Sequence, residues 1–441
     1  HWKDRVVQAL REACRVQAVV TIALLPLTLY WFYQVSIVSP LANAVAIPVV
    51  SYIVRSVDEL LRKEFGLEDG LADTTTWGEM IKRNPAIKLP PLTDTPGEKK
   101  TIKETEPFVQ ILDPATGTAT FLVEVINIIE KTVKAKAWTK LKKGVYDHDQ
   151  HSKREEVLKA WNEYVPEYLL KRLHAYEIMM APYVIAHMKV GLKLAETGYQ
   201  FATEERARIY LTNALEPKKD FKERLNFDIP ALAIEARQVN EVKNHNRFTV
   251  IVGNPPYSGH SSNPTRKEDG ELTYAGELLD RYFHFDGKPL GEKQPKWLHD
   301  DYVKFTRLGE SLLCLSGIGI LGFITNHGFI KNPTFRGMRE SLLSTFGHLW
   351  LLDLGGSAKK KIRGTQDIDE NVFDIEQGTA ITVGVVGCNK VSSETYHASM
   401  HGTRGSKYNS LLGSSVASTA FSHVEARRPY LLLSPSESKI G

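Results

Sequence analysis

Five short apolar runs, separated by segments with a helical pattern, constrain the fold of this 441-residue chain more than any other feature. The runs are FVQIL (108–112), FTVIV (248–252), GILGFIT (319–325), LWLLDL (349–354) and AITVGVV (380–386). Runs of this length are typical of buried strands, and their alternation with amphipathic helical patterns favours an α/β fold. We therefore predict one mostly parallel sheet as the framework of the molecule.

Composition and charge narrow the class of protein further. The chain is 42% hydrophobic and 24% charged, which excludes a disordered chain, a collagen and a coiled coil. The net charge of +4 permits an anionic partner without requiring one. Three widely spaced cysteines, Cys14, Cys314 and Cys388, cannot build a disulfide framework or a cysteine-rich zinc site. We therefore expect a reducing compartment, the cytoplasm.

The first fifty residues differ from the rest in their charge and hydrophobicity. No charged residue or histidine stands between Arg15 and Arg55, and residues 17–39 are long enough to cross a hydrocarbon core. Arg15 and the arginines before it flank this stretch as positive-inside anchors would. We expect residues 1–50 to be an apolar helical segment that contacts a membrane through residues 17–39. A buried helical hairpin and a signal sequence are the alternatives.

A glycine-containing turn follows the first apolar run. Its sequence is DPATGTATF, from Asp113 to Phe121, and the helical pattern after it is apolar on one face. A strand, a tight turn and a helix N-terminus place backbone N–H groups at the carboxyl end of a sheet, where α/β proteins bind ligands. Asp113 can accept a hydrogen bond from an amino group, and Gly117 lets a ligand approach the backbone closely. An ordinary strand-to-helix turn shares these features. The motif is neither a P-loop nor the dinucleotide fingerprint.

The second apolar run leads into a sharper signal, Gly253-Asn254-Pro255-Pro256-Tyr257. Two prolines fix the backbone and remove donors, which leaves carbonyl groups free to face a cleft. The side-chain carbonyl of Asn254 and the backbone carbonyl of Pro255 can accept both hydrogens of one exocyclic amine. Tyr257 offers a flat face to a base taken out of the stack. The alternative is a proline-rich turn that closes a strand.

Taken together and in this order, DPATGTATF and GNPPY resemble motifs I and IV of amino-methyltransferases that use S-adenosylmethionine. From about residue 48 to the end, the chain is similar to the adenine-specific (N6) DNA methyltransferase part of Type ISP and Type IIG restriction-modification enzymes. Phrases such as VDELLRKEFGLEDGLAD, NPTFRGMRESLL and DENVFDIEQGTAI carry the likeness. Residues 1–50 resemble a transmembrane part of the bacterial competence DNA-uptake channel family. The resemblance implies a Rossmann-like methyltransferase sheet with helical insertions.

The resemblance also implies roles for individual residues. Glu177 would accept the ribose hydroxyls of the cofactor, and because it follows Gly117 by sixty residues, residues 131–170 must form a helical insertion. Phe373 would face the flipped base opposite Tyr257. The residues implied in cofactor binding are Asp113, Pro114, Ala115, Thr116, Gly117, Glu177 and Asn213, and those implied in catalysis are Asn254, Pro255, Pro256 and Tyr257.

The resulting hypothesis is methyl transfer from S-adenosylmethionine to adenine in double-stranded DNA, with the adenine flipped out and no metal involved. Catalysis would consist mostly of positioning and desolvation. Methylation of a protein glutamine amide is an alternative, because Asn-Pro-Pro-Tyr also suits a planar amide. A membrane DNA-uptake component with an inactive methyltransferase part is another.

Two departures from the family pattern bear on cofactor binding. Ala119 stands where motif I usually has a second glycine, and LANAVAI (41–47) stands where a Tyr-Thr-Pro segment is usual. For the domain organisation we predict an apolar segment (1–50), a helical lead-in (51–107), the methyltransferase domain (108–390) and the start of a target-recognition region (391–441).

Overall fold

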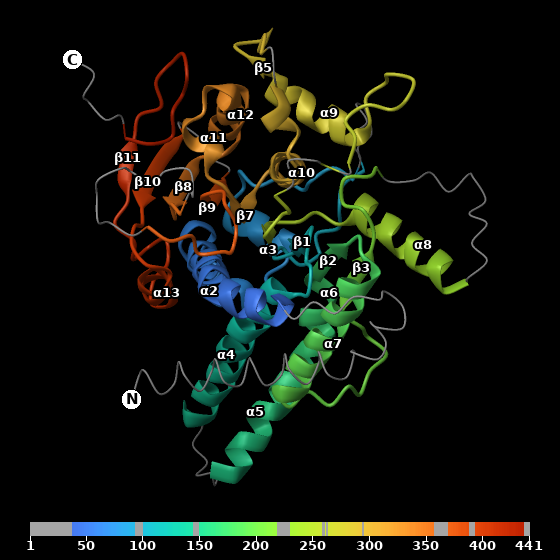
Figure 1. Ribbon diagram of the computed structural model, residues 1–441. Coiled ribbons are helices and arrows are strands. Elements are labelled where there is room, and N and C mark those ends of the chain that lie inside the picture. The colour runs from blue at the N-terminus through green and yellow to red at the C-terminus, as the bar shows by residue number, and fades with distance from the viewer. Residues whose placement is uncertain are drawn as a thin grey trace.

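The computed structural model describes residues 38–92, 100–143, 150–217, 230–257, 261, 263–292, 295–356, 369–387 and 393–435. Within them, nine strands form one sheet, flanked by helices on both faces (Figure 1). The strands are β1 Ile111–Asp113, β2 Leu173–Glu177, β3 Arg208–Leu211, β4 Val250–Gly253, β7 Gly319–Asn326, β8 His348–Asp353, β9 Thr379–Val386, β10 Glu394–Ser399 and β11 Ser422–Val424. A separate small hairpin pairs β5 His284–Phe285 with β6 Lys288–Pro289.

The order of the strands shows where a ligand crevice should lie. The sheet runs β11-β10-β8-β9-β7-β4-β1-β2-β3. Neighbours from β7 through β4, β1 and β2 to β3 are parallel, whereas β9 is antiparallel to both β7 and β8. The chain moves outward from β1 to β3 and then returns to β4 on the other side of β1. Ligands of open α/β sheets bind at such a reversal, outside the carboxyl ends of the strands.

The helices cover the sheet in two layers with separate cores. They are α2 Val38–Phe65, α3 Trp77–Arg83, α4 Thr120–Lys143, α5 Gln150–Tyr164, α6 Leu170–Arg172, α7 Met180–Glu196, α8 Pro230–His245, α9 Tyr274–Asp280, α10 Asp301–Ser316, α11 Gly328–Lys331, α12 Arg336–Thr345 and α13 Arg404–Leu412. One core gathers α2, α4 and α7 on one face of the sheet, and the other gathers α8, α10 and α12 on the opposite face. Strands covered on both faces read as continuous apolar runs, which is the pattern in the sequence.

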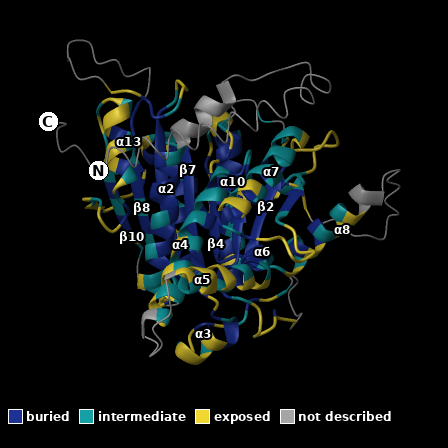
Figure 2. Ribbon diagram, turned by 90° about the horizontal axis from the view of Figure 1, so that it is seen from below, coloured by how far each residue is buried: buried dark blue, intermediate teal, exposed yellow. Residues whose placement is uncertain are grey.

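Helix α2 is built into the core of the sheet. Tyr52, Ile53, Val54 and Val57 have no exposed surface, and the strands with much of α2 are buried (dark blue in Figure 2). Burying an aliphatic or aromatic side chain contributes roughly 1.5–3 kcal/mol each. This helix therefore anchors the start of the described chain on the same face as α4 and α7.

All five predicted runs are strands of one sheet, so the predicted α/β class is confirmed. Two strands that flank the crevice, β2 and β3, were not among the predicted runs. β2 (LHAYE) is fully buried but contains His174 and Glu177, and β3 (RIYL) begins with Arg208. Polar residues inside four- or five-residue strands weaken the apolar signal on which the prediction rests.

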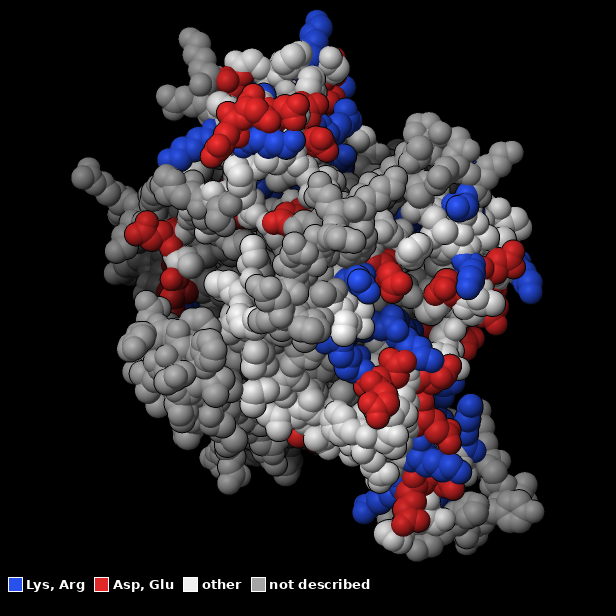
Figure 3. Space-filling view, turned by 90° about the vertical axis from the view of Figure 1, so that its right-hand side faces the viewer, with Lys and Arg blue, Asp and Glu red and all other residues white. Residues whose placement is uncertain are grey.

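The predicted helical insertion is also present. Helices α4 and α5, followed by a π-helical turn (Val165–Leu169) and α6, fill the space in the chain between β1 and β2. The α4–α5 pair projects from the body of the molecule (Figure 1). Lysines and arginines are mixed with acidic residues over this projection in the view of Figure 3. This face therefore has the character of a solvated helical surface rather than of a uniform basic patch.

Two of the predicted domains lie at the ends of the chain. The predicted membrane segment, residues 17–39, lies almost entirely outside the described residues. Among the helices that the structure describes, none is long and apolar enough to cross a membrane. At the other end, β10 and β11 extend the same sheet, and α13 packs beside α2. The described residues after 391 therefore extend the central sheet or pack against its helix α2.

Candidate active site

The two sequence motifs meet at the reversal between β1 and β4. β1 pairs with β4 in parallel, so Asp113 and Gly253 end neighbouring strands at the same edge of the sheet. A Cβ added at Gly253 would lie 3.0 Å from Asp113 Oδ1 and 3.6 Å from Pro114 Cδ. Because those contacts leave little room for a side chain, glycine before Asn254 lets the two turns approach each other.

The turn after β1 is held by two backbone N–H groups that donate hydrogen bonds to residues of β2. Thr116 N donates to Tyr176 O at 3.0 Å, and Gly117 N donates to Glu177 Oε2 at 2.9 Å. Pro114 and Ala115 lie at its start, where Ala115 N donates to Asp113 Oδ1 at 3.2 Å. The turn then enters α4 at Thr120. The predicted cofactor loop is thus a fixed strand-to-helix turn.

Glu177, sixty residues from Gly117 in sequence, lies against this turn. It ends β2, and its Oε1 accepts hydrogen bonds from Ile178 N at 3.0 Å and Met179 N at 2.9 Å. With the bond from Gly117, three backbone N–H groups point at one carboxylate. These three hydrogen bonds fix the orientation of the Glu177 carboxylate. The carboxylate is therefore held at the carboxyl end of β2, against the turn that follows β1.

Asp113 is a buried carboxyl group at the carboxyl end of β1. It is 1% exposed, and burial raises its pKa to about 7 although Ala115 N donates to it; the nearby charge of Glu177 acts in the same direction as burial. A buried carboxyl with a raised pKa is strongly stabilised as a carboxylate by a cation placed beside it. The site is therefore suited to a ligand that carries an ammonium group.

Three features of this turn fit S-adenosylmethionine. Gly117 has φ +54°, and a Cβ placed there would meet nothing within 4 Å, so the backbone faces open space. The buried Thr116 hydroxyl lies beside the Asp113 carboxyl group and hydrogen-bonds to it, which helps to hold that carboxyl group in place. Three exposed apolar residues follow Glu177, namely Ile178, Met179 and Met180. Sequence reasoning missed this apolar rim, although an apolar triplet directly after the acidic end of a strand is visible in the sequence.

Ala119 occupies a backbone conformation that favours glycine. Its φ is +64°, and its side chain is fully buried. An L-residue in this region costs on the order of 1–2 kcal/mol relative to the right-handed region. Replacement of the usual glycine therefore leaves the backbone turn in place and strains it.

We expect Ala119→Gly to leave the free energy of unfolding unchanged or to raise it. Relief of the strained φ offsets the loss of a buried methyl group, which is worth about 0.8 kcal/mol. The matched control is Ala186→Gly, at another fully buried alanine, inside helix α7. That change should lower stability by about 1 kcal/mol or more, since glycine is unfavourable inside a helix. Urea unfolding of both variants tests this; equal losses would show that Ala119 is unstrained.

Asn213 lies beyond the end of β3 and contacts a residue that lines a surface cavity. Its Oδ1 accepts from Leu215 N at 2.9 Å, and its Nδ2 donates to Asn263 Oδ1 at 2.9 Å. Asn263 lines a cavity of about 430 Å³ that Lys304 and His299 also line. Asn213 therefore joins the turn after β3 to the segment that follows the Asn-Pro-Pro-Tyr turn. Lys304 and its ion-pair partner Asp301 were not predicted from sequence.

The Asn-Pro-Pro-Tyr turn presents Asn254 to the surface and packs Tyr257 inward. Asn254 and Pro256 are exposed, whereas Pro255 is buried. The Tyr257 hydroxyl donates to Asn254 Oδ1 at 2.7 Å. Burial, with the charge of Asp300, raises the pKa of Tyr257, so its hydroxyl stays a donor. The Tyr257 ring contacts the Tyr302 ring of α10 at a centroid distance of 6.3 Å. The turn thus fixes the orientation of the Asn254 amide.

Phe373 lies at the same edge of the sheet, in the loop that precedes β9. β9 is antiparallel to β7, so its first residue, Thr379, pairs with the last residue of β7, Asn326. Within the loop, Phe373 N donates a hydrogen bond to Asn371 Oδ1 at 3.0 Å. The half-buried Phe373 ring packs against the core on the α2 face. The structure thus brings Phe373 to the predicted edge; its stacking on a base stays a prediction.

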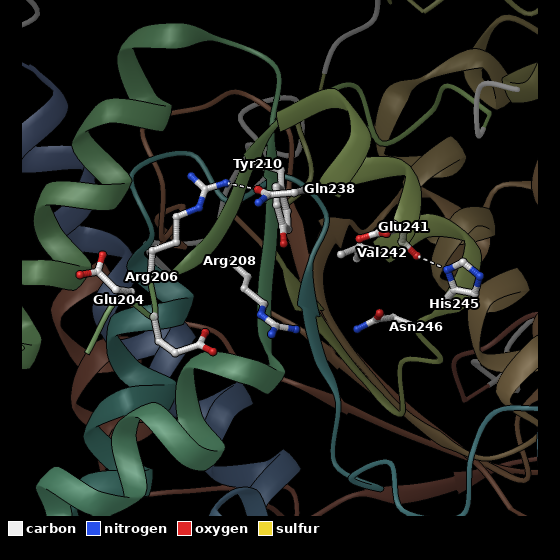
Figure 4. Close-up of a pocket in the computed structure, with 10 residues that line it drawn as sticks. Glu204, Arg206, Arg208, Tyr210, Gln238, Glu241, Val242, His245 and Asn246 are labelled. Atoms are coloured by element: carbon white, nitrogen blue, oxygen red, sulfur yellow. Dashed lines mark hydrogen bonds between the residues drawn. The ribbon is translucent and has the colours of Figure 1, made fainter. Parts of the chain in front are cut away.

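A second cavity is larger than the one that Asn263 lines. It measures about 590 Å³ and opens between β3 and α8, where Arg206, Arg208 and Tyr210 line it (Figure 4). Arg206 Nη2 donates to Gln238 Oε1 at 2.7 Å. Arg208 is the first residue of β3, so the cavity is at the amino end of that strand. Its lining contains none of the residues predicted for the cofactor or for catalysis.

Two family models match parts of the chain. Residues 153–359 match the family described as Eco57I restriction-modification methylase, a range that includes Glu177, Asn213 and the Asn-Pro-Pro-Tyr turn. Residues 1–57 match the competence protein family. No curated protein matches the chain.

Three solved structures share the fold. The Type ISP restriction-modification enzyme LlaGI, as a nuclease-deletion mutant with a DNA substrate mimic, aligns with TM-score 0.63 and 21% identity over 88% of this chain and 26% of that chain. The Type ISP enzyme LlaBIII bound to DNA gives 0.61 and 24% over 87% and 21%. The DrdV–DNA complex gives 0.61 and 22% over 88% and 31%. The chain spans about a fifth to a third of these proteins, and it shares the fold of the part of each with which it aligns.

Proposed function

We propose that this protein transfers a methyl group from S-adenosylmethionine to the exocyclic amine of adenine in DNA, as the modification part of a restriction-modification system. The observation that carries the proposal is the meeting of two turns at one edge of the sheet. One turn carries Asp113 and Gly117, with Glu177 of β2 hydrogen-bonded to it, and the other presents Asn254 and Pro255. A cofactor turn and an amine-binding turn side by side are what direct transfer between two bound molecules requires.

The cofactor would lie along the turn after β1. The buried Asp113 would accept from its ammonium group, Gly117 would let it approach the backbone, and Glu177 would accept from its ribose hydroxyls. Ile178 and Met179 would cover its adenine ring, because both are exposed beside Glu177. When bound, S-adenosylmethionine supplies an electrophilic methyl group.

The residues of the second turn would hold and orient the target amine. An adenine amine is a weak nucleophile because its lone pair is delocalised into the ring. Two acceptors, Asn254 Oδ1 and Pro255 O, draw the two N–H groups toward the protein and leave the lone pair pointing away from them. Asn254 Oδ1 has a second lone pair, so it can accept from the amine while Tyr257 donates to the first.

DNA is the proposed partner for two reasons. Structures that share the fold were solved with DNA. A base must also leave the duplex to reach a turn at the carboxyl edge of a sheet, and stacking between Tyr257 and Phe373 would stabilise it there. A glutamine amide of a protein has the same planar shape and remains a possible outcome of the test below.

The test is transfer of tritiated methyl groups by the full chain to an equal mass of mixed-sequence duplex DNA and of unfolded protein. The proposal predicts label in DNA, and it predicts that a boiled enzyme transfers none. Label in protein alone would contradict the DNA assignment and favour amide methylation. Absence of cofactor binding by calorimetry would contradict the methyltransferase assignment as a whole.

We expect cofactor affinity to rise with pH up to about pH 7. The raised pKa of Asp113 means that the free protein holds a proton there below pH 7, and a bound ammonium group requires that proton to leave. Affinity should therefore rise by up to about tenfold per pH unit below pH 7 and level off above it. Calorimetric titrations from pH 5.5 to 8 measure this. Asp113→Asn should bind more weakly and lose the pH dependence; an unchanged profile in this variant would contradict the role of Asp113.

A further inference from the structure

Helix α13 lies against the segment 369–374, which we call the Phe373 loop. The helix comes from the part of the chain predicted to begin a target-recognition region, and the loop precedes β9. Three side chains on two successive turns of α13, Arg404, Lys407 and Tyr408, all contact the loop. A helix that directs three side chains to one short loop sets the position of that loop.

Arg404 donates several hydrogen bonds to the loop around Phe373. Its Nε donates to Asn371 O at 2.8 Å, and its Nη2 donates to Asp374 Oδ1 at 2.6 Å and to Phe373 O at 3.4 Å. Its backbone N donates to Glu370 Oε2 at 2.7 Å. The guanidinium therefore holds the carbonyl groups of the loop on both sides of Val372. Planar guanidinium groups fix geometry better than an ammonium does, because their donors are pre-oriented.

Lys407 and Tyr408 hold the start of the loop. The Lys407 side chain is fully buried, and its Nζ donates to Asp369 Oδ1 at 2.6 Å, Glu370 O at 2.7 Å and Leu354 O at 2.6 Å. The Tyr408 hydroxyl donates to Val372 O. All three donors of a buried ammonium are thus used to tie the loop to the end of β8.

The helix is itself anchored to α2. Arg55 donates to Ser414 O at 2.5 Å and to Leu412 O at 2.9 Å, at the C-terminal end of α13. Val416 N donates to Ser56 Oγ at 2.9 Å. A cation at the C-terminus of a helix also interacts favourably with the helix dipole. The chain of contacts therefore runs from α2 through α13 to the Phe373 loop.

We propose that α13 is a positioning element for the target-base pocket, with Arg404, Lys407 and Tyr408 as positioning residues that set where the Phe373 ring stands. This inference rests on the proposed function. It assigns the described start of the predicted target-recognition region a role in holding the flipped base, irrespective of sequence readout.

The experiment compares Arg404→Ala and Tyr408→Phe with Asn409→Ala in the full chain. Asn409 is exposed on the same helix and serves as the matched control. Arg404→Ala should lower kcat for DNA methylation by roughly 10–100-fold, because small displacements of a positioning group have effects of this size. Cofactor Kd and the far-UV spectrum should be unchanged. Tyr408→Phe should give a smaller loss, and Asn409→Ala none.

A second readout separates positioning from general loss of structure. Sequencing of methylated DNA first locates the target adenine, and 2-aminopurine is then placed at that position. A base that is flipped but poorly stacked fluoresces more strongly, so Arg404→Ala and Phe373→Ala should both raise the signal. The double variant should be no worse than Phe373→Ala alone, because both changes remove one interaction.

The outcomes distinguish this inference from the proposed function. If the wild-type chain binds cofactor but methylates no DNA, the proposed function is wrong. If the wild type methylates DNA and Arg404→Ala retains full kcat and wild-type fluorescence, the proposed function stands and α13 has no positioning role. Additive losses in the double variant would likewise contradict the inference.

Discussion

Changing Asn254 to alanine is expected to abolish methyl transfer while cofactor binding persists. Asn254 Oδ1 is an exposed acceptor at the carboxyl edge of β4, oriented by the Tyr257 hydroxyl. Removing the Asn254 amide leaves Pro255 O as the one proposed acceptor for the target amine, so the lone pair of the amine is no longer oriented toward the methyl group. Loss of one preorganised hydrogen-bonding group at a reaction centre lowers kcat by roughly 10²–10³-fold. The variant should still bind S-adenosylmethionine with wild-type Kd, because Asn254 belongs to the Asn-Pro-Pro-Tyr turn and not to the proposed cofactor turn after β1.

The matched control for this change is Tyr257→Phe. It keeps the aromatic face and both proposed acceptors and removes only the hydroxyl that orients Asn254. A loss of about tenfold or less is expected, in line with one neutral hydrogen bond. Single-turnover rates with saturating cofactor measure both variants. Full activity of Asn254→Ala would refute its role as amine acceptor.

Changing Glu177 to glutamine is expected to weaken cofactor binding without abolishing the chemistry. The carboxylate accepts from three backbone N–H groups, and hydrogen bonds to a charged acceptor are worth about 1.5–3 kcal/mol each. An amide retains one acceptor oxygen and introduces a donor, which leaves Gly117 N or the ribose hydroxyls without a partner. Kd should therefore rise by roughly 10–100-fold. At saturating cofactor, kcat should fall much less.

Glu196→Gln serves as the control, because Glu196 is half-exposed on α7 and pairs with Lys193. Its cofactor Kd should equal that of the wild type. Thermal unfolding of Glu177→Gln shows how far the turn itself is destabilised. An unchanged Kd in a stable Glu177→Gln variant would remove Glu177 from the cofactor site.

Much of the fold could be predicted from the sequence, because buried parallel strands are written as continuous apolar runs. FTVIV and AITVGVV are strands within one residue or two of their predicted bounds. β10 could not be found in this way, since ETYHAS alternates polar and apolar residues on an outer strand. Helix α2 begins within the apolar N-terminal stretch and packs in the core. Apolar sequence alone therefore did not distinguish a membrane segment from a buried helix.

The site was predictable only in part. The motifs placed Asp113 and Asn254 at the ends of two strands. The close approach of Asp113 to Gly253, the residue before Asn254, depends on a strand order that the spacing of residues does not encode. Glu177 was placed by resemblance, and its hydrogen bond to Gly117 follows from the pairing of β1 with β2. The conformation of Ala119 could not be predicted, because φ is decided by the helix start that follows. The contacts of α13 join residues far apart in sequence, which no local pattern reveals.

The measurement that tests the central claim most directly is analysis of the product base. The full chain is incubated with duplex DNA and S-adenosylmethionine that carries a deuterated methyl group, and the DNA is digested to nucleosides for mass spectrometry. The account predicts deuterated N6-methyldeoxyadenosine with the wild type and at most traces with Asn254→Ala. Label on cytosine, or equal label from both proteins, would contradict it.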